Sequence, residues 1–285
     1  MADIKKIKKL RSLSGAGFKD CSSALNESNG DIDKAIEILR VKGISKASKK
    51  MSRLANEGII AISEDDQSSS ILEINCETDF VAKNEDFISF CKELSEINFI
   101  CKANLEKINS YKTKNGQTVE DNLVSLIAKI GEKITIRRAN FFNNENGVNS
   151  FYVHSAIEKN IGKIIAIVKL EGGTSKEIKE LGTKIAMHVA ASNPLSITES
   201  GIDKKIVDKE LEIIKAEIIN SGKPAEMVDK ISKGKINKFL NDNSLLNQIW
   251  IMDSQKKVSD VIKENSSNGQ IKIKDFIRFK VGEGV

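Results

Sequence analysis

The stretch EINCETDFVAKN, which runs from Glu73 to Asn84, changes its character within a few residues. Its first residues have the composition of a β-strand, and Asn84 is placed to cap a following helix. Asp79 and Phe80 lie in the polar turn between these two elements. Composition alone favours a buried ring for Phe80 and a capping role for Asp79. The polar neighbours instead favour a ring that a turn presents to a partner protein.

The composition restricts the class of protein. The 285 residues carry 45 basic and 40 acidic side chains, and the net charge of +5 is mixed along the chain. This length allows two or three compact units. Only the first helix and the run Lys46–Arg53 are locally basic, and such runs are usually solvated faces. The chain shows no secretory signal or membrane-spanning apolar run, and four scattered cysteines indicate a cytoplasmic protein with free thiols.

Residues 1–52 are expected to form an N-terminal bundle of three helices. Apolar residues recur at helical spacing on both sides of the glycines in the segments 14–17 and 30–31. Gly43 is expected to close the third helix. The basic run Lys46–Arg53 then reads as the linker to the next unit.

A mixed α+β core in two lobes is expected to follow, with the lobes at 53–140 and 141–200. Helices are predicted after the caps Asn84, Thr118 and Ser175, and Gly131 is placed to end the second of them. The segments that read as strands are 58–63, 69–76, 133–139, 150–155 and 161–173. The first two of these form a predicted hairpin.

A protruding antiparallel hairpin of two long helices is expected at 201–242. Four apolar residues follow the 4-3-4 spacing of a coiled-coil seam, and these are Val207, Leu211, Ile214 and Ile218. Pro224 is suited to the first turn of the second helix. Apolar surface that the seam does not use would face a partner or a second copy of the chain.

Residues 243–285 are expected to return to the second lobe and to form a C-terminal module. A short helix is predicted at 258–263. Five apolar residues between Ile271 and Val281 share one face of a strand pattern, and both a half-buried strand and a short helix-like packing element fit. The expected fold class is therefore α+β with several domains and with antiparallel sheets in the core.

The sequence lacks the common motifs of catalysis. His188 lies at helical spacing from Leu181 and Ile185, which favours a packed histidine, and His154 has no cysteine or carboxylate at ligand spacing. No phosphate-binding glycine loop, nucleophile elbow or zinc motif occurs, and aromatic residues make up only 5% of the chain. No cofactor or metal is expected. A site of bare carboxylates, and a ribosome- or RNA-binding role of the basic segments, remain open alternatives.

Six segments resemble, in the same order, the elongation factor Ts family of bacterial guanine-nucleotide exchange factors. They are LRSLSGAGFKDC, EINCETDFVAK, LIAKIGEKITIRR, IAMHVAASNP, SGKP and FIRFKVGEG. The resemblance covers almost the whole length. It implies an N-terminal domain like a ubiquitin-associated (UBA) domain, a core of two subdomains, a coiled coil and a C-terminal module. It also implies a cytoplasmic elongation factor without covalent chemistry.

The resemblance further implies contacts with elongation factor Tu, in its GDP-bound and nucleotide-free forms. The segment associated with magnesium displacement in that partner is Thr78, Asp79, Phe80 and Val81. The other implied contact residues are Phe18, Lys19, Ile130, Gly131, His154, Ile251 and Met252. Ser22 and Ser23 depart from the family pattern, because many members carry two lysines there. A homodimer through the hairpin is a further expectation, whereas DNA and membranes are not expected partners.

Phe80 would wedge between side chains of the partner and shift the helix beneath its magnesium and phosphates. Asp79 has two open roles, since it would either hold that helix by hydrogen bonding or repel the bound phosphate. GDP would then leave and GTP would enter, because the factor and the nucleotide weaken each other's binding.

Overall fold

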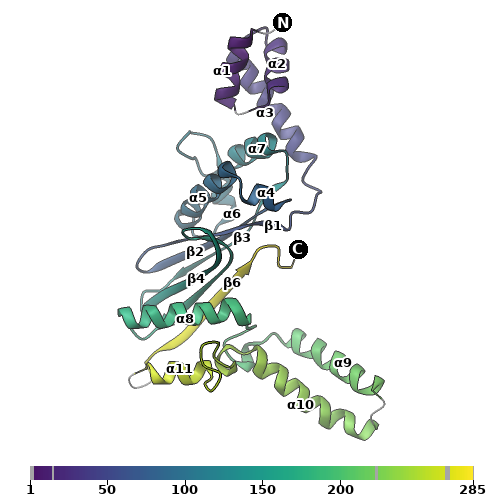
Figure 1. Ribbon diagram of the computed structural model, residues 1–285, viewed down its shortest axis with the longest axis vertical. Helices are drawn as coiled ribbons and strands as arrows, with labels where there is room; N and C mark the ends of the chain where they lie inside the picture. The colour runs from purple at the N-terminus through teal and green to yellow at the C-terminus, as the bar shows by residue number, and fades with distance from the viewer. Residues whose placement is uncertain (1–2, 15, 222–223, 267–269, 285) are drawn as a thin grey trace.

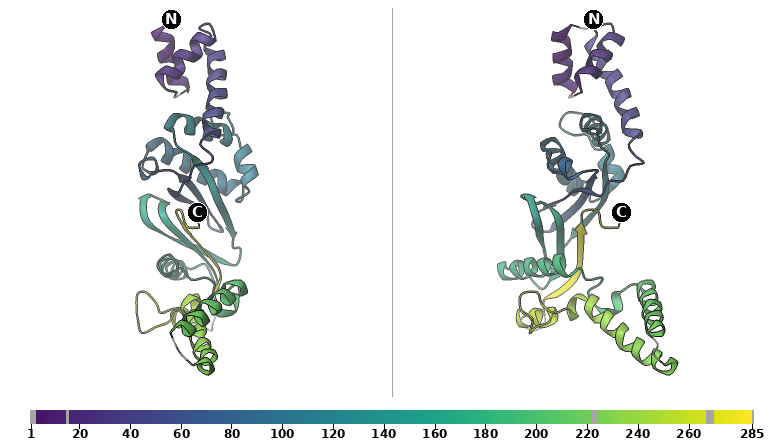
Figure 2. Two further views of the ribbon diagram at one scale, coloured as in Figure 1. Left: turned by 90° about the vertical axis from the view of Figure 1, so that its right-hand side faces the viewer. Right: turned by 45° about the vertical axis from the view of Figure 1, so that its right-hand side comes forward.

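The structure is a computed structural model that describes residues 3–14, 16–221, 224–266 and 270–284. It is an elongated α+β protein in which a helical bundle lies at one end, a sheet in the middle and a pair of helices at the other end (Figures 1 and 2). Gly15 of the expected first turn, and Gly222 and Lys223 of the SGKP segment, lie outside the described residues. In the described ranges no helix combines the length and apolar content needed to cross a bilayer.

The N-terminal bundle consists of α1 (Ile4–Ser14), α2 (Phe18–Glu27) and α3 (Ile32–Ser48). Its small core includes Leu10, Cys21 and Leu25, which are fully or almost fully buried. The prediction that Gly43 ends the third helix is wrong, because α3 continues to Ser48 and includes the start of the expected linker.

Gly43 instead lies where α3 packs against α7 (Val119–Ile130). A Cβ atom at this position would lie 3.5 Å from the Cβ of Ala128 and 3.9 Å from Cγ1 of Val124. The small residue therefore allows close approach of two helices from different units. Sequence spacing does not reveal this role, because the partner helix lies about 80 residues further along the chain.

The described strands form one antiparallel sheet with the order β3-β2-β1-β5-β4, and β6 also pairs with β5. The strands are β1 (Glu57–Glu64), β2 (Ser68–Cys76), β3 (Ile134–Asn143), β4 (Gly147–Glu158), β5 (Ile161–Glu171) and β6 (Lys272–Lys280). The expectation of separate sheets in two lobes is wrong, because β1 and β5 pair through Ile60–Gly162 and Ala61–Ile161. This joint is short, so two halves of one sheet meet at a narrow ladder.

Each half of the sheet nevertheless has its own apolar core. The helices of the first half are α4 (Asp79–Ala82), α5 (Glu85–Ile100), α6 (Leu105–Ser110) and α7. Phe87 and Leu94 of α5 are fully buried against β1 and β2. The predicted caps are confirmed, because the side chains of Asn84 and Thr118 accept backbone N–H bonds and Gly131 adopts the left-handed conformation at φ 89°.

The second half is covered by α8 (Lys176–Ser192), which begins at the predicted cap Ser175. The chain continues through a 3-10 turn (Glu199–Gly201), α9 (Lys204–Asn220), α10 (Ala225–Asn243), a second 3-10 turn (Leu245–Asn247) and α11 (Val258–Glu264). Ile185 and Trp250 lie in the core that α8 shares with β4 and β5. Figure 1 shows α9 and α10 side by side and away from the sheet.

The C-terminal segment forms a strand, but its apolar residues do not share one face. Ile273 lies in the core beneath α8, whereas Ile277 and Phe279 pack in a separate cluster with Ile60 and Ile165. A register shift between Lys169 and Leu170 leaves an extra residue on β6 between its two halves. Because a bulge of one residue reverses the alternation, the predicted single apolar face is wrong.

Substitutions at Gly43 test the close approach of α3 and α7. Gly43→Ala is expected to raise the free energy of unfolding by about 0.5–1 kcal/mol, because alanine fits at van der Waals distance and favours the helix. Gly43→Leu is expected to lower it by roughly 1–3 kcal/mol, because the larger side chain overpacks the contact. Urea unfolding followed by circular dichroism measures both changes.

Gly234 in α10 is the matched control, since no heavy atom lies within 4 Å of a Cβ built there. Both Gly234→Ala and Gly234→Leu are expected to be tolerated. Equal effects of leucine at the two positions would show that α3 and α7 do not require a small residue.

Candidate functional site

Phe80 lies on a one-turn helix that leaves its ring in solvent. The side chain is 81% exposed, although the neighbouring Val81 and Ala82 are buried in the first core. The hydroxyl of Thr78 accepts a hydrogen bond from the Val81 N–H at 3.4 Å and so caps this turn. The buried pair fixes α4 on the core, and the adjacent position on the helix then points outward. The interpretation of Phe80 as a core residue is therefore wrong.

Two carboxylates tie this turn to the segment that follows α7. Glu132 accepts one hydrogen bond from the Thr78 backbone N–H at 3.0 Å and another from the Thr78 hydroxyl at 2.8 Å. Glu77 makes the reverse connection, since its carboxylate accepts the Lys133 N–H at 2.6 Å. The two turns thus exchange side-chain contacts, and Gly131 lies directly before Glu132. The bonds of Glu132 and Glu77 therefore place the chain after Gly131 beside Thr78.

A buried thiol supports the same turn. The Cys76 Sγ atom donates to the Thr78 carbonyl oxygen at 3.1 Å. Burial raises the pKa of Cys76 to about 12, so the thiol remains protonated and keeps its donor at neutral pH. The role of this cysteine is structural, in agreement with the prediction of inert thiols.

Asp79 does not cap α4, since Thr78 occupies that position. Its carboxylate instead pairs with Lys83 one turn later, at 2.8 Å. The hydrogen bond from Lys83 holds the pKa of Asp79 below its usual range. Both side chains are about half exposed or more, at 49% and 68%, so solvent screens this pair. The carboxylate is ionised and remains accessible beside the Phe80 ring.

The four residues of the predicted segment are not equivalent. Phe80 and Asp79 reach solvent, whereas Val81 is only 7% exposed and packs in the first core. The Val81 side chain is therefore an anchor of the turn, and the assignment of the segment Thr78–Val81 to partner binding stays a prediction. Glu132 and Glu77 were not singled out from the sequence, because nothing in their spacing marks their contacts with a distant turn.

Phe18 and Lys19 lie in the first turn of α2 and are exposed. The Phe18 side chain is 51% exposed, whereas the nearby Cys21 is buried in the bundle. Ser23 donates to Glu27 at 2.9 Å within the same helix. The bundle and α4 lie apart in Figures 1 and 2, so Phe18 belongs to a surface separate from that of Phe80.

His154 lies on β4 and its side chain is exposed. One ring nitrogen lies 3.3 Å from the hydroxyl of Tyr152, and the two rings are 6.0 Å apart between centroids. β4 is the edge strand of the second half of the sheet, whereas the Phe80 turn follows β2 in the first half.

Ile251 and Met252 are exposed by 43% and 45% in the loop before α11. Two more exposed apolar residues, Leu195 at 43% and Ile249 at 55%, lie in the connections after α8 and α10. Neither residue was predicted from the sequence as a contact residue. The alternation in the segment QIWIMD could have indicated Ile249, because this residue lies next to the buried Trp250 and so points away from the core.

His188 fixes the backbone of this loop, and the surrounding bonds determine its tautomer. The amide nitrogen of Gln248 donates to the Asp242 carbonyl at 2.8 Å, so its Oε1 atom is the acceptor that faces His188 Nε2 at 2.9 Å. Nε2 therefore carries the proton, and Nδ1 accepts the Ile251 N–H at 3.3 Å. The ring also stacks on Trp250, with centroids 5.3 Å apart. The prediction of a packed histidine is confirmed.

Comparisons with known proteins identify the class. The family profile described as Elongation factor TS matches residues 77–283. Elongation factor Ts of Clostridium kluyveri is 41% identical over 293 residues, which cover 100% of this chain and 94% of the relative. Elongation factor Ts of Clostridium perfringens is 40% identical over 291 residues, with the same shares covered. The chain is thus a translation elongation factor.

More specifically, the chain belongs to the elongation factor Ts family. The match extends from one end of the chain to the other, so it includes the N-terminal bundle and the helical pair as well as the sheet. The resemblance of the six segments is confirmed.

Glu132→Ala tests the connection between the two turns. The substitution removes the acceptor of the half-buried Thr78 N–H and hydroxyl, at an expected cost of about 1.5 kcal/mol. Amide hydrogen exchange across residues 79–83 is therefore expected to accelerate by about tenfold. Mass spectrometry of the exchanged peptides measures this rate. Glu96→Ala, at an exposed position of α5, is the control, and similar acceleration in both variants would contradict the connection.

The buried His188 predicts a pH dependence of stability. Burial lowers its pKa below the ordinary value of 6.5, so the unfolded state binds the proton more tightly. The stability that neutral His188 provides is present above pH 6.5 and falls as the pH decreases through that value. The limiting slope is about 1.4 kcal/mol per pH unit. Urea unfolding between pH 7.5 and 5 compares the parent with His188→Gln, and identical slopes would contradict this assignment.

Proposed function

We propose that the protein binds elongation factor Tu in its GDP-bound form and promotes GDP release by disturbing the partner's magnesium and phosphate site. The observation that carries the proposal is the 81% exposed ring of Phe80 on a turn with a fixed backbone. A large exposed apolar side chain is a suitable anchor for a partner pocket. Because the turn is already ordered, binding loses little conformational entropy there.

The exchange step would use the strict geometry of magnesium. Magnesium bridges phosphate and other hard oxygen ligands in a near-octahedral arrangement, so a small displacement of the surrounding groups weakens it. We propose that Phe80 enters between partner side chains and shifts the helix beneath this site. The protein and GDP would then each lower the affinity of the other, and a new nucleotide would reverse the process. No covalent bond is made or broken in this scheme.

Asp79 would act beside the ring. Its ionised carboxylate is accessible, and its pairing with Lys83 lowers the net charge that it presents. We propose that Asp79 accepts hydrogen bonds from the partner helix after Phe80 has entered. Repulsion of the bound phosphate would contribute less than these hydrogen bonds, because Lys83 offsets much of the negative charge of Asp79 at a distance. Ile130 and Gly131 would approach the same part of the partner, since Glu132 holds them next to Thr78.

Other surfaces would extend the contact to more than one domain of the partner. Phe18 and Lys19 are exposed on the N-terminal bundle and are proposed to contact its nucleotide-binding domain. His154 on β4 is proposed to contact a distal domain, together with Ile251 and Met252. Several modest surfaces on one rigid body bind tightly when engaged together, yet each dissociates readily.

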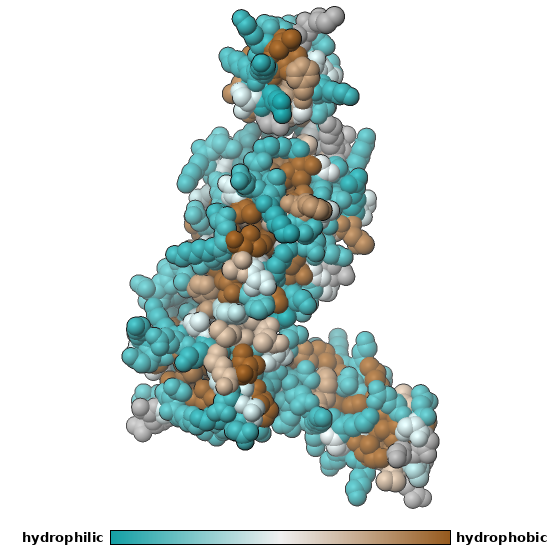
Figure 3. Space-filling model, viewed as in Figure 1, coloured by the Kyte–Doolittle hydropathy of each residue, from teal (hydrophilic) through white to brown (hydrophobic). Residues whose placement is uncertain are grey.

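The remaining parts of the chain are proposed to form the modules of the family. The proposed domains are 1–52, which is UBA-like, 53–140, 141–200, 201–242, which is an antiparallel coiled coil, and 243–285. Ile214 and Ile218 are buried along the α9–α10 seam, whereas Ile213 and Ile219 are exposed by 45% and 62%. Figure 3 shows apolar residues gathered over this pair, which supports a homodimer through the hairpin as a secondary proposal.

A cytoplasmic location follows from the proposed role, because elongation factor Tu acts during translation in that compartment. The alternative of an RNA-associated basic protein is not favoured by the family assignment. The Ser22 and Ser23 positions lack the lysine charges of many relatives, so the bundle contact is proposed to rely more on Phe18.

Phe80→Ala is the direct test of the proposed wedge. The rate of labelled GDP release from elongation factor Tu is expected to fall by about 30-fold at a fixed subsaturating concentration, as for loss of a hot-spot side chain worth about 2 kcal/mol. Stopped-flow fluorescence measures this rate. The unfolding free energy is expected to change by less than about 0.5 kcal/mol, because the ring is in solvent.

Ile100→Ala provides a matched control, since Ile100 is another large apolar residue that is 59% exposed, at the end of α5. This variant is expected to keep the parent rate. An unchanged rate with Phe80→Ala, or no acceleration by the parent protein at stoichiometric amounts, would refute the proposed function.

A further inference from the structure

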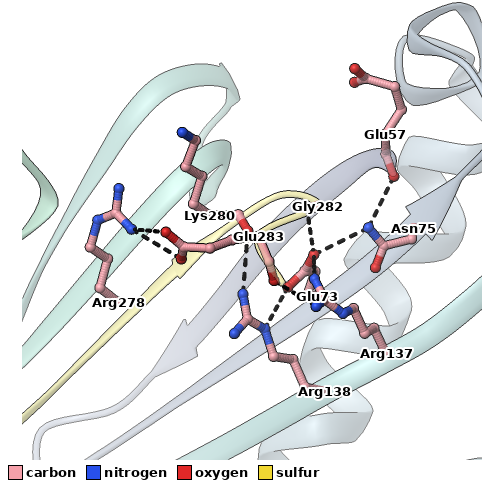
Figure 4. A network of polar contacts seen from close by, with 9 residues as sticks. All are labelled: Glu57, Glu73, Asn75, Arg137, Arg138, Arg278, Lys280, Gly282 and Glu283. Atoms are coloured by element: carbon pink, nitrogen blue, oxygen red, sulfur yellow. Dashed lines mark hydrogen bonds and ion pairs between the residues drawn. The ribbon is translucent and has the colours of Figure 1, made fainter. Parts of the chain in front are cut away.

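The C-terminal turn after β6 fills the place where the two halves of the sheet diverge. On one edge of β5, β1 pairs only at residues 161 and 162, and β6 takes over at Ile164. Between these ladders the Val281 N–H donates to the Lys163 carbonyl at 3.0 Å. The turn therefore lies between the end of β6 and the start of β1, as Figure 4 shows from close by.

A fully buried carboxylate from the first half of the sheet holds this turn. Glu73 of β2 accepts hydrogen bonds from the backbone N–H of Gly282 at 3.0 Å and from Asn75 at 3.1 Å (Figure 4). It also pairs with Arg137 at 2.9 Å and with Arg138 at 2.6 Å. A buried charge is costly unless donors surround it, so these four contacts depend on one another.

A β-bulge explains how two consecutive arginines reach one carboxylate. Glu73 pairs with Arg138 and Ile74 pairs with Ile136, which leaves Arg137 as the additional residue on β3. Neighbouring side chains on a regular strand point to opposite faces, whereas a bulge redirects one of them. The function proposed above gives no role to this arrangement.

The same arginines also hold the C-terminal turn. Arg137 donates to the Glu283 carbonyl at 2.6 Å, and Arg138 donates to the Lys280 carbonyl at 3.3 Å. The Arg138 guanidinium lies 4.1 Å from the centre of the Phe279 ring. The turn is thus fastened to the first half of the sheet at both ends.

The second half of the sheet fastens the turn independently. Arg278 of β6 pairs with the Glu283 carboxylate at 2.9 Å and donates to the Ala190 carbonyl of α8 at 3.0 Å.

The Gly282 backbone has φ +74°, and a Cβ atom there would lie 2.3 Å from the Asn56 carbonyl oxygen. We call residues 280–283, with Glu73, Arg137, Arg138 and Arg278, the C-terminal clasp.

The clasp connects the elements that carry the two proposed contact surfaces. Glu73 lies on β2, the strand that leads directly into the Phe80 turn. On the other side, His154 pairs with Ile164, and Ile164 pairs with Lys280, so these residues share one rung across β4, β5 and β6. An apolar cluster also joins the halves, but apolar contacts are not directional, whereas hydrogen bonds define an angle.

We infer that the C-terminal clasp is a positioning element that sets the angle between the halves of the sheet. This angle in turn sets the spacing between the Phe80 surface and the surface of His154, Ile251 and Met252. The inference rests on the proposed function for its effect on binding. A partner that must engage both surfaces at once binds with an affinity that depends on this spacing.

Gly282→Ala is the main test, because the added methyl group collides with the Asn56 carbonyl and loosens the turn without altering a contact surface. Gly116→Ala is the matched control, since Gly116 has a similar φ of +81° but no atom within 4 Å of a built Cβ. Glu73→Gln is a second variant that removes the buried charge. If Glu73→Gln does not fold, Gly282→Ala alone decides the outcome.

The first measurement needs no partner. Spin labels at Ser89→Cys on α5 and Lys184→Cys on α8 report the distance between the halves by pulsed electron paramagnetic resonance. The labelled chain also carries Cys101→Ser, because Cys101 is partly exposed whereas the other native thiols are buried. Gly282→Ala is expected to broaden or shift the distance distribution, and Gly116→Ala is expected to leave it unchanged. Equal distributions in the two variants would overturn the inference.

The second measurement is GDP release at varied concentrations of elongation factor Tu. Gly282→Ala is expected to raise KM by about tenfold and to leave kcat within about twofold, because joint engagement is impaired while the wedge is intact. A changed distance with an unchanged KM would also overturn the positioning role. A failure of the proposed function is distinguishable from this result. If that function is wrong, Phe80→Ala in the otherwise unmodified chain leaves GDP release unaffected.

Discussion

The pairs Ile60–Gly162 and Ala61–Ile161 join β1 to β5, and the geometry of the whole molecule depends on this short ladder. The N-terminal bundle and the Phe80 turn belong to the half of the sheet that contains β1, β2 and β3. The exposed groups of β4 and of the loop before α11 belong to the other half. Two residue pairs give little resistance to twisting, so further contacts add to it, among them the apolar cluster around Ile165, the bonds of Lys163 to Glu57 and Gly58, and the C-terminal clasp.

Within the first half, the exposed ring of Phe80 lies on a turn whose neighbouring residues are buried and hydrogen-bonded. Phe80 leaves a large apolar area in water. The folded state therefore lacks the stabilisation that burial of this ring would provide. The compensation is local, because Val81 is buried and Thr78 is bonded twice to Glu132. Proteins commonly break a folding rule at a functional position and stabilise it from neighbouring residues. A ring held in this way reaches a partner without a loss of backbone freedom.

Features set by short-range chemistry were predictable from the sequence. The caps Asn84, Thr118 and Ser175 were found correctly, because a capping side chain acts within three residues of its own position. The left-handed Gly131 was found for the same reason. The polar neighbours of Phe80 already favoured a ring presented to a partner, and the resemblance to the family segments supplied the other candidate contact residues.

Features that depend on distant segments were not predictable. Gly43 resembled a helix end, and only the packing of α7 explains why a small residue lies inside the helix there. The bulge in β6 changes which face Ile277 occupies, and no local signal in the sequence marks it. The exposure of Phe80 also remained open, because composition favoured a buried ring. The contacts of Glu132 and Glu73 span about 54 and 209 residues, beyond the reach of periodicity.

The arrangement of Asp79 and Phe80 assigns them unequal shares of the proposed exchange step. Phe80 has little intramolecular packing to lose on entry into a partner, since its side chain is 81% exposed. Asp79 must first give up or share its bond with Lys83, although an exposed pair of this kind contributes little stability. We therefore propose that the ring would provide the main driving force, through burial of apolar area. In this proposal the carboxylate would adjust the contact afterwards, and Lys83 would limit the charge that it brings.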